Sequence, residues 1–309
     1  MANKEPSAMP MSTERKTVYH LQKMKDEGKL ISMVGTAFCD PLWAAACEYA
    51  GVDLVRFLGP GENCAIRDVT LKGHLRQIRK MAPNINLNAV MQSSTHGDKY
   101  TATAVAGELL TDGVDSVMPM ALTMDTLKYM ADNWIPIYGH VGCLSGWQVG
   151  WFGGYSRVGK TAEDALAIFR MAYEYQENGM AGMTIEMTSR EVTDYIAKKL
   201  RIPVISVAAG GAADGSELVI FDLLGFQPTY TMPKHAKYYR KFFEDSIEAF
   251  RQFDVDIKTG VYPEDKHGWG MDEKEYEKFA NELEQNYPDA VTKNVQLKTK
   301  PTNIKPAKK

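Results

Sequence analysis

Residues 183–207 read MTIEMTSREVTDYIAKKLRIPVISV. The stretch begins with a short apolar run, Met183–Glu186, and ends with another, Pro203–Val207. Between them, Ser189–Leu200 is amphipathic and long enough for a helix. Short runs without polar alternation are typical of parallel strands that are buried on both faces. The stretch therefore predicts a strand, a helix and a second strand parallel to the first.

The same alternation recurs along most of the chain. The predicted strands are Leu30–Val34, Asp53–Phe57, Ile85–Met91, Ser116–Met120, Ile135–Gly139, Met183–Glu186 and Pro203–Val207. The predicted helices are Pro41–Ala50, Thr70–Met81, Ala102–Thr111, Thr123–Asn133, Ala162–Asn178, Ser189–Leu200, Gly215–Leu224, Lys234–Phe253 and Asp272–Gln285. Alternation of this kind indicates an α/β protein with a parallel sheet and crossover helices.

Such a sheet is either open and doubly wound or closed into a (β/α)8 TIM barrel. The sequence contains neither the GxGxxG fingerprint nor the GxxxxGK[ST] loop of nucleotide-binding open sheets. We therefore predict the barrel, with its active site at the carboxyl ends of the strands. No linker rich in Pro, Gly or Ser interrupts residues 16–290, which we expect to form a single domain. We expect a disordered arm over residues 1–15 and a basic tail over residues 291–309.

The charge balance is close to neutral. Among 309 residues, 36 are Lys or Arg and 39 are Asp or Glu, which gives a net charge of −3. This balance provides no basic surface for nucleic acid or an anionic membrane. The chain has no apolar run long enough to span a membrane, no signal-peptide core at its start and no CxxC pair among its four cysteines. We predict a cytoplasmic protein that binds a small molecule.

Polar residues at the predicted strand ends are the candidates for chemistry. Glu186 ends a buried run, where a carboxylate is costly unless it is paired or used. It is either a general base or half of a structural ion pair. His140 follows the run near Pro136, where it would transfer a proton, bind an anion or have only a structural role. Gly210 and Gly211 form a turn whose N–H groups would bind an anion, although such turns often only pack.

Four long segments occur in an order that is typical of one enzyme family. They are IPIYGHVGCLSGWQVGWFGGYSRVGK at 135–160, MTIEMTS at 183–189, IPVISVAAGGAADGSELVIFDLLGF at 202–226 and TGVYPEDKHGW at 259–269. In this order they resemble the ketopantoate hydroxymethyltransferase (3-methyl-2-oxobutanoate hydroxymethyltransferase) family, and a looser similarity extends over about residues 17–269. The resemblance implies a (β/α)8 barrel of the phosphoenolpyruvate mutase/isocitrate lyase superfamily that assembles into a homo-oligomer.

The resemblance also implies an activity. Members of the family transfer a hydroxymethyl group from 5,10-methylenetetrahydrofolate to a 2-oxo acid. A divalent metal, usually magnesium, chelates the 2-oxo acid and stabilises the enolate that forms when its C3 proton is removed. The histidine and the glutamate of the family correspond to His140 and Glu186.

The metal-binding positions of the family carry other residues in this chain. Gly59-Pro60-Gly61 stands where the family has Gly-Asp-Ser, and Met118-Pro119-Met120 stands where it has Lys-x-Glu. The aspartate that ends the third strand corresponds to Val90, or to Met91 if the register moves by one. Hard cations prefer oxygen ligands, which thioethers do not replace. We therefore expect no magnesium site and no metal ligands.

These departures predict a pocket that is more apolar than the family's. Its substrate-binding residues would be Gly59, Gly61, Met91, Met118, Met120, Gly210 and Gly211. A displaced metal site built from Asp40, Glu62 or Asp68 is the less favoured alternative. The substrate would then be a carboxylic or 2-oxo acid, with 5,10-methylenetetrahydrofolate as co-substrate.

We predict a divergent enzyme of this family. It would make or break a C–C bond next to a carbonyl, or transfer a one-carbon unit, without the family's magnesium. Glu186 would accept or donate the proton, and His140 would hold a carboxylate or a developing oxyanion. The alternatives are a non-catalytic small-molecule-binding protein on the same barrel and a superfamily lyase or isomerase with a rebuilt metal site.

Overall fold

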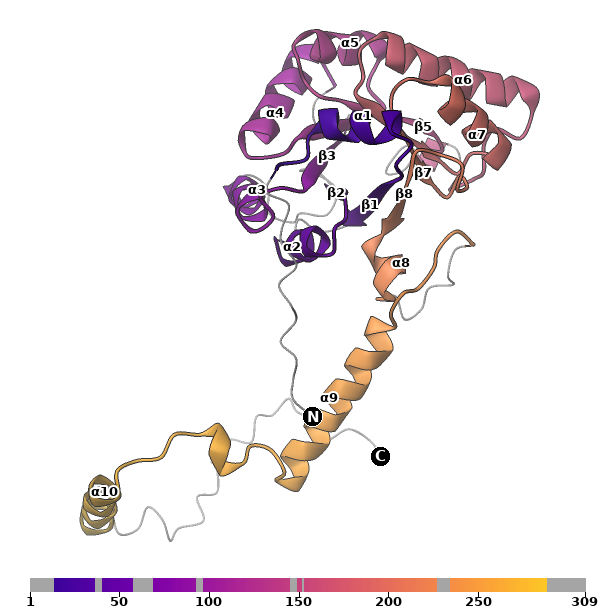
Figure 1. The fold of residues 1–309 in the computed structure, drawn as a ribbon. Coiled ribbons are helices and arrows are strands. Elements are labelled where there is room, and N and C mark those ends of the chain that lie inside the picture. Colours follow the sequence, from indigo (N-terminus) through magenta and orange to yellow (C-terminus); the bar gives the residue numbers. More distant parts are fainter. Residues whose placement is uncertain are drawn as a thin grey trace. The chain divides into compact units, whose positions relative to one another are not determined.

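The computed structural model describes residues 14–36, 41–57, 69–92, 97–144, 149–151, 153–226 and 234–287. The chain divides into two compact units, Met1–Asp245 and Ser246–Lys309 (Figure 1). The predicted arm lies outside the described residues except for Glu14 and Arg15, and the predicted basic tail lies outside them entirely.

Eight parallel strands form the sheet of the first unit. They are β1 Ile31–Thr36, β2 Leu54–Phe57, β3 Asn86–Gln92, β4 Ser116–Met120, β5 Tyr138–Gly142, β6 Gly182–Glu186, β7 Val204–Val207 and β8 Gly215–Val219. Their order in the sheet is β4-β3-β2-β1-β8-β7-β6-β5. A parallel bridge between Val117 and Ile137 joins β4 to β5, and the Val117 N–H donates to the carbonyl of Pro136 at 3.0 Å. The sheet thus closes on itself, and the predicted (β/α)8 barrel is confirmed.

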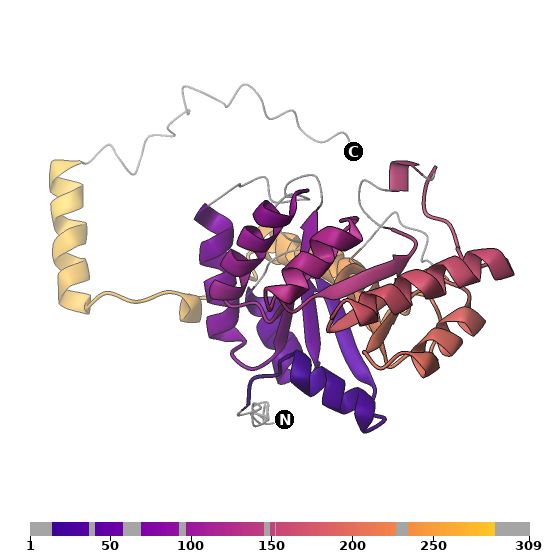
Figure 2. The ribbon, with the colours of Figure 1, turned by 90° about the horizontal axis from the view of Figure 1, so that it is seen from above.

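The helices of this unit alternate with the strands and lie outside them, except that α1 lies across one end of the barrel (Figures 1 and 2). They are α1 Val18–Asp26, α2 Pro41–Tyr49, α3 Val69–Met81, α4 Lys99–Thr111, α5 Met124–Asp132, α6 Ala162–Glu177, α7 Arg190–Lys199 and α8 Ile220–Leu224. Only β7 is followed directly by the next strand, without a helix between them in the described segment 208–214. No helix within the described ranges is long and apolar enough to cross a membrane.

The last strand of the barrel differs from the sequence-based prediction. The pattern of Gly215–Leu224 predicts one helix, but the structure divides this segment into β8 and α8. β8 holds a glycine, a serine and a glutamate in place of the apolar run that is typical of a buried strand. Its backbone pairs with β1 on one side and with β7 on the other. Pairing within the barrel therefore overrides the local pattern.

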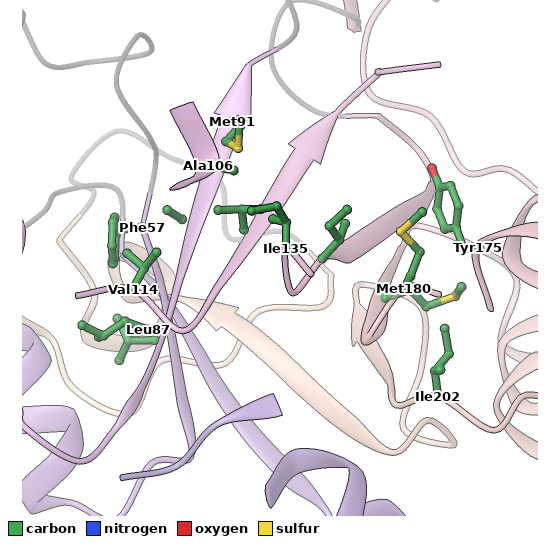
Figure 3. Packing of buried hydrophobic residues seen from close by; sticks show 14 of the residues in the cluster. Phe57, Leu87, Met91, Ala106, Val114, Ile135, Tyr175, Met180 and Ile202 are labelled. Carbon is green, nitrogen blue, oxygen red and sulfur yellow. The ribbon is translucent and has the colours of Figure 1, made fainter. Parts of the chain in front are cut away.

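Two apolar clusters pack on opposite faces of the strands. The cluster in the barrel interior consists of Leu21, Ile31, Met33, Leu54, Val90, Met118, Met120, Tyr138 and Ile205. The outer cluster lies between the strands and the helices, and it places Met91 of β3 beside Ala106 of α4 (Figure 3). Successive side chains of a strand point to opposite faces. Val90 therefore takes the interior position, and the expectation that Met91 lines the pocket does not fit the structure.

The barrel interior also holds a buried ion pair. The guanidinium of Arg56 on β2 lies 2.6 Å from a carboxylate oxygen of Glu217 on β8, and the two side chains are 6% and 7% exposed. Arg56 also donates from Nε to Asn88 on β3 at 2.8 Å, and Asn88 donates to Ser116 on β4 at 2.8 Å. A polar chain thus runs through the interior from β8 to β4.

Glycine on the intervening strand makes this pair possible. β1 lies between β2 and β8, and a Cβ at Gly35 would lie 2.6 Å from a carboxylate oxygen of Glu217. Burial raises the pKa of Glu217 and lowers the pKa of Arg56, and the attraction between the two charges opposes both shifts. The ion pair therefore compensates two charges that would be costly if either were left alone.

Removing one partner of the Arg56–Glu217 pair should destabilise the barrel more than removing both. We expect Arg56→Met or Glu217→Met alone to lower the free energy of unfolding by about 3–5 kcal/mol, because an uncompensated buried charge remains. The double variant should recover most of this loss. Urea denaturation of the three variants measures the difference. Single variants that unfold at the wild-type urea concentration would contradict this account.

The helices that follow the barrel bury no residue. α9 spans Phe242–Thr259 and α10 spans Glu273–Asn286, with a short 3-10 turn at Asp265–His267 between them. The sequence predicts one domain up to residue 290, but the second compact unit begins at Ser246. An amphipathic pattern shows that a helix has an apolar face without showing which surface that face covers. The pattern therefore does not locate this boundary.

Candidate active site

His140 and Glu186 lie side by side on neighbouring strands. In the register of β5 and β6, His140 pairs with Thr184, and Gly142 pairs with Glu186. The Nε2 atom of His140 lies 3.3 Å from Oε2 of Glu186, and the side chains are 3% and 14% exposed. The structure thus brings the two predicted strand-end residues into contact. Glu186 is the more accessible of the two.

The hydrogen bonds of His140 fix its proton on Nε2. This nitrogen lies 2.9 Å from the carbonyl oxygen of Cys143. A carbonyl oxygen only accepts hydrogen bonds, so Nε2 is the donor and neutral His140 has its lone pair on Nδ1. The same nitrogen lies 3.3 Å from the carboxylate of Glu186, so the positive end of the N–H dipole is beside that carboxylate. In the neutral ring, Nδ1 stays available as an acceptor.

Buried contacts hold the backbone at His140. The hydroxyl of Tyr175 on α6 donates to the carbonyl of His140 at 3.1 Å. The preceding residue, Gly139, leaves room for the Tyr175 ring, which a Cβ at that position would strike. Burial raises the pKa of Tyr175 to about 12, so the phenol stays protonated and keeps donating at neutral pH.

Gly142 at the end of β5 lets the chain approach Glu186 closely. Its φ of 92° lies in the left-handed region, and a Cβ there would collide with the carbonyl oxygen of Glu186. Immediately after it, the N–H of Cys143 donates to that same carbonyl at 2.9 Å. This bond ties the end of β5 to the end of β6. It thereby sets the distance between the imidazole and the carboxylate.

Left-handed residues follow three other strands at this end of the barrel. Ala121 comes after β4, Met187 after β6 and Ala208 after β7, with φ angles of 54°, 47° and 54°. Residues with a side chain adopt this conformation at an energetic cost, and such positions cluster at functional sites. The strain at the strand ends therefore agrees with a site at the carboxyl end of the barrel.

The Gly-rich turn after β7 is stabilised by hydrogen bonds to the Ser206 side chain. The hydroxyl of Ser206 donates to the carbonyl of Gly210 at 2.6 Å and accepts from the N–H of Ala209 at 3.3 Å. Gly210 has a φ of 94° and packs against Arg190, whereas Gly211 faces open space. The turn lies at the same end of the barrel as Glu186, and anion binding there stays a prediction. Gly59, together with Gly61, lies outside the described residues.

Several interior polar residues, among them Arg56, Glu217 and Thr184, were not among the predicted site residues. The sequence could have pointed to Arg56. A charged residue there interrupts a run that is otherwise apolar and predicted to be buried on both faces. Glu217 and Thr184 carry no such signal, since their interior position depends on strand boundaries and register.

Comparison with known proteins identifies the family. The family model described as ketopantoate hydroxymethyltransferase matches residues 15–265. The chain belongs to the ketopantoate hydroxymethyltransferase family. The sequence resemblance is therefore confirmed, and so is the prediction of an enzyme.

Individual relatives agree with this assignment. The chain is 29% identical to 3-methyl-2-oxobutanoate hydroxymethyltransferase 1 of Methylibium petroleiphilum, over 91% of this chain and 98% of that protein. It is 33% identical to the 3-methyl-2-oxobutanoate hydroxymethyltransferase of Hyperthermus butylicus, over 86% of this chain and 94% of that protein. Among solved structures, the carboxyl transferase domain of Rhizobium etli pyruvate carboxylase shares the fold, with a TM-score of 0.51, 13% identity and coverage of 72% of this chain and 46% of that chain.

Family membership corrects the expectation about magnesium. The expectation that magnesium is not used is wrong, because the chain belongs to a family that depends on a divalent metal. Within the described residues, no three His, Cys, Asp or Glu side chains gather into a group that could hold a metal ion. Asp40, Glu62 and Asp68 lie outside those residues. The described residues alone therefore do not provide the oxygen ligands that a magnesium ion needs.

Adding a side chain at Gly142 should disturb the site and the fold together. We expect Gly142→Ala to lower the free energy of unfolding by about 1–3 kcal/mol, because it combines a left-handed φ with a collision against Glu186. Gly107→Ala is the matched control, since Gly107 lies within α4 with open space around it. The control should gain up to about 1 kcal/mol from helix propensity. Equal unfolding midpoints for the two variants in urea would refute the proposed constraint.

Proposed function

We propose that the protein transfers a hydroxymethyl group to C3 of a 2-oxo acid, with 3-methyl-2-oxobutanoate as the acceptor. The observation that carries this proposal is the contact between His140 and Glu186 at the carboxyl end of the barrel. Family membership supports the reaction class. In net terms, a C3–H bond is replaced by a C3–CH2OH group, 5,10-methylenetetrahydrofolate supplies the carbon, water supplies the hydroxyl and tetrahydrofolate is released.

Glu186 is the base in this proposal. Its carboxylate accepts the C3 proton, which leaves the electron pair of the C–H bond on the 2-oxo acid as an enolate. One carboxylate oxygen, Oε2, lies 3.3 Å from the Nε2 of His140. The other oxygen is then the one that takes the proton. Positioning of this kind matters because proton transfer needs a donor and acceptor within hydrogen-bond reach.

His140 positions the base in this proposal. Its Nε2–H donates to the carbonyl of Cys143, Nε2 also lies 3.3 Å from the carboxylate of Glu186, and the ring is almost fully buried. The sequence suggests that His140 holds the substrate's carboxylate or oxyanion. The geometry supports the more specific role of orienting Glu186. A homo-oligomeric state and a cytoplasmic location also belong to the proposal, since the resemblance and the composition favour them.

The half-reaction at C3 tests the proposal without the one-carbon donor. We expect the protein to exchange the C3 proton of 3-methyl-2-oxobutanoate for deuterium in D2O buffer with magnesium, followed by NMR. Glu186→Gln should slow the exchange by about 10²–10⁴-fold, because the amide does not accept the proton. Glu191→Gln, at an exposed carboxylate on α7, is the control and should exchange at the wild-type rate.

The outcomes of this experiment separate the substrate from the base. Wild-type protein that does not exchange the C3 proton would exclude this 2-oxo acid as the substrate. Exchange that persists in Glu186→Gln would remove Glu186 as the base. Exchange lost in Glu191→Gln as well would point to a change in the fold rather than in the site.

A further inference from the structure

Two buried polar atoms beside Glu186 have no partner within the described part of the chain. They are the hydroxyl oxygen of Thr184 and the Nδ1 of His140. Thr184 is fully buried and His140 is 4% exposed. Buried polar atoms are nearly always hydrogen-bonded, and an exception calls for a bound water or ligand. Both atoms therefore indicate a polar group that the described part of the chain does not supply.

The barrel brings these two atoms to the same place. Thr184 pairs in register with His140 on the neighbouring strand. Thr184 also lies two residues before Glu186, so its side chain shares the interior face with that carboxylate. The intervening residue, Ile185, packs in the outer cluster against the helices. The unpartnered hydroxyl is thus next to the imidazole, one residue pair deeper in the barrel than Glu186.

The chemistry of the two atoms defines what they bind. Because Nε2 of His140 donates to the carbonyl of Cys143, Nδ1 is an acceptor in the neutral ring. The hydroxyl of Thr184 both donates and accepts. A group that donates one hydrogen bond and accepts another satisfies both atoms at once. An alcohol is such a group, whereas a carboxylate or a ketone only accepts.

The proposed reaction creates an alcohol at this position. The acceptor 2-oxo acid has no hydroxyl, but hydroxymethyl transfer places one on the carbon attached to C3. We infer that Thr184 and Nδ1 of His140 form a subsite for the new hydroxyl group of the product. This inference rests on the proposed function. It makes Thr184 a residue that distinguishes the hydroxylated product from the acceptor.

Thr184→Val tests the subsite, because valine keeps the shape of threonine and removes the hydroxyl. Two ligands differ only in that hydroxyl: 4-hydroxy-3,3-dimethyl-2-oxobutanoate, which is the expected product, and 3,3-dimethyl-2-oxobutanoate. Calorimetric titration in magnesium buffer measures the affinity for each. We expect Thr184→Val to weaken binding of the hydroxylated ligand by about 3- to 10-fold, the range of one hydrogen bond. Binding of the other ligand should not change.

A matched control separates a binding role from a structural one. Thr193 on α7 is also fully buried, but its hydroxyl donates to the carbonyl of Ser189 at 3.2 Å. Thr193→Val should melt at a lower temperature than wild type and bind both ligands normally. Thr184→Val should melt at the wild-type temperature or higher, because its hydroxyl makes no hydrogen bond within the described part of the chain.

Two other results for Thr184→Val would overturn the subsite. If Thr184→Val binds both ligands as wild type does, the two atoms hold only a buried water and the inference fails. If it weakens both ligands equally, or melts well below wild type, its hydroxyl has a structural role and the inference also fails. C3 exchange of 3-methyl-2-oxobutanoate by the wild-type protein tests the proposed function separately, because that acid has no hydroxyl. Wild-type exchange together with unchanged product affinity in Thr184→Val would therefore overturn the subsite while leaving the proposed function intact.

Discussion

The hydrogen bond from the Cys143 N–H to the carbonyl of Glu186 is the constraint on which the site depends. It fastens the end of one strand to the end of the next, and the carbonyl of Cys143 in turn accepts from His140. The N–H and the carbonyl of one residue, Cys143, thus hold the base and its partner. Because these contacts belong to the backbone, the spacing of imidazole and carboxylate is set by the barrel itself rather than by mobile side chains.

Most of the fold follows from the periodicity of the sequence, and the exceptions have physical causes. Seven of the eight strands overlap runs that are mostly apolar, and those runs are visible because both of their faces are buried. The eighth strand carries Glu217 toward the interior, which is acceptable only because Arg56 lies opposite. That compensation joins residues 161 positions apart, so no local pattern reveals it.

The candidate site was only partly predictable for a related reason. Glu186 ends β6 and His140 lies within β5, two residues before its end, and pairing of the two strands makes them neighbours. Met91 and Val90 differ by one position, and one position reverses the face of a strand. Sequence comparison with the family could not settle that register, whereas the packing of Met91 against Ala106 does (Figure 3).

Gly35 has a consequence for how the barrel interior can vary. The space that its missing side chain leaves is filled by the carboxylate of Glu217. Positions 35 and 217 therefore share one volume, although they lie at opposite ends of the barrel sequence. A larger residue at the first requires a smaller one at the second, and Arg56 would then lose its counter-charge. In an evolving sequence the three positions should change as a set, so a conventional single-site library would miss the viable combinations.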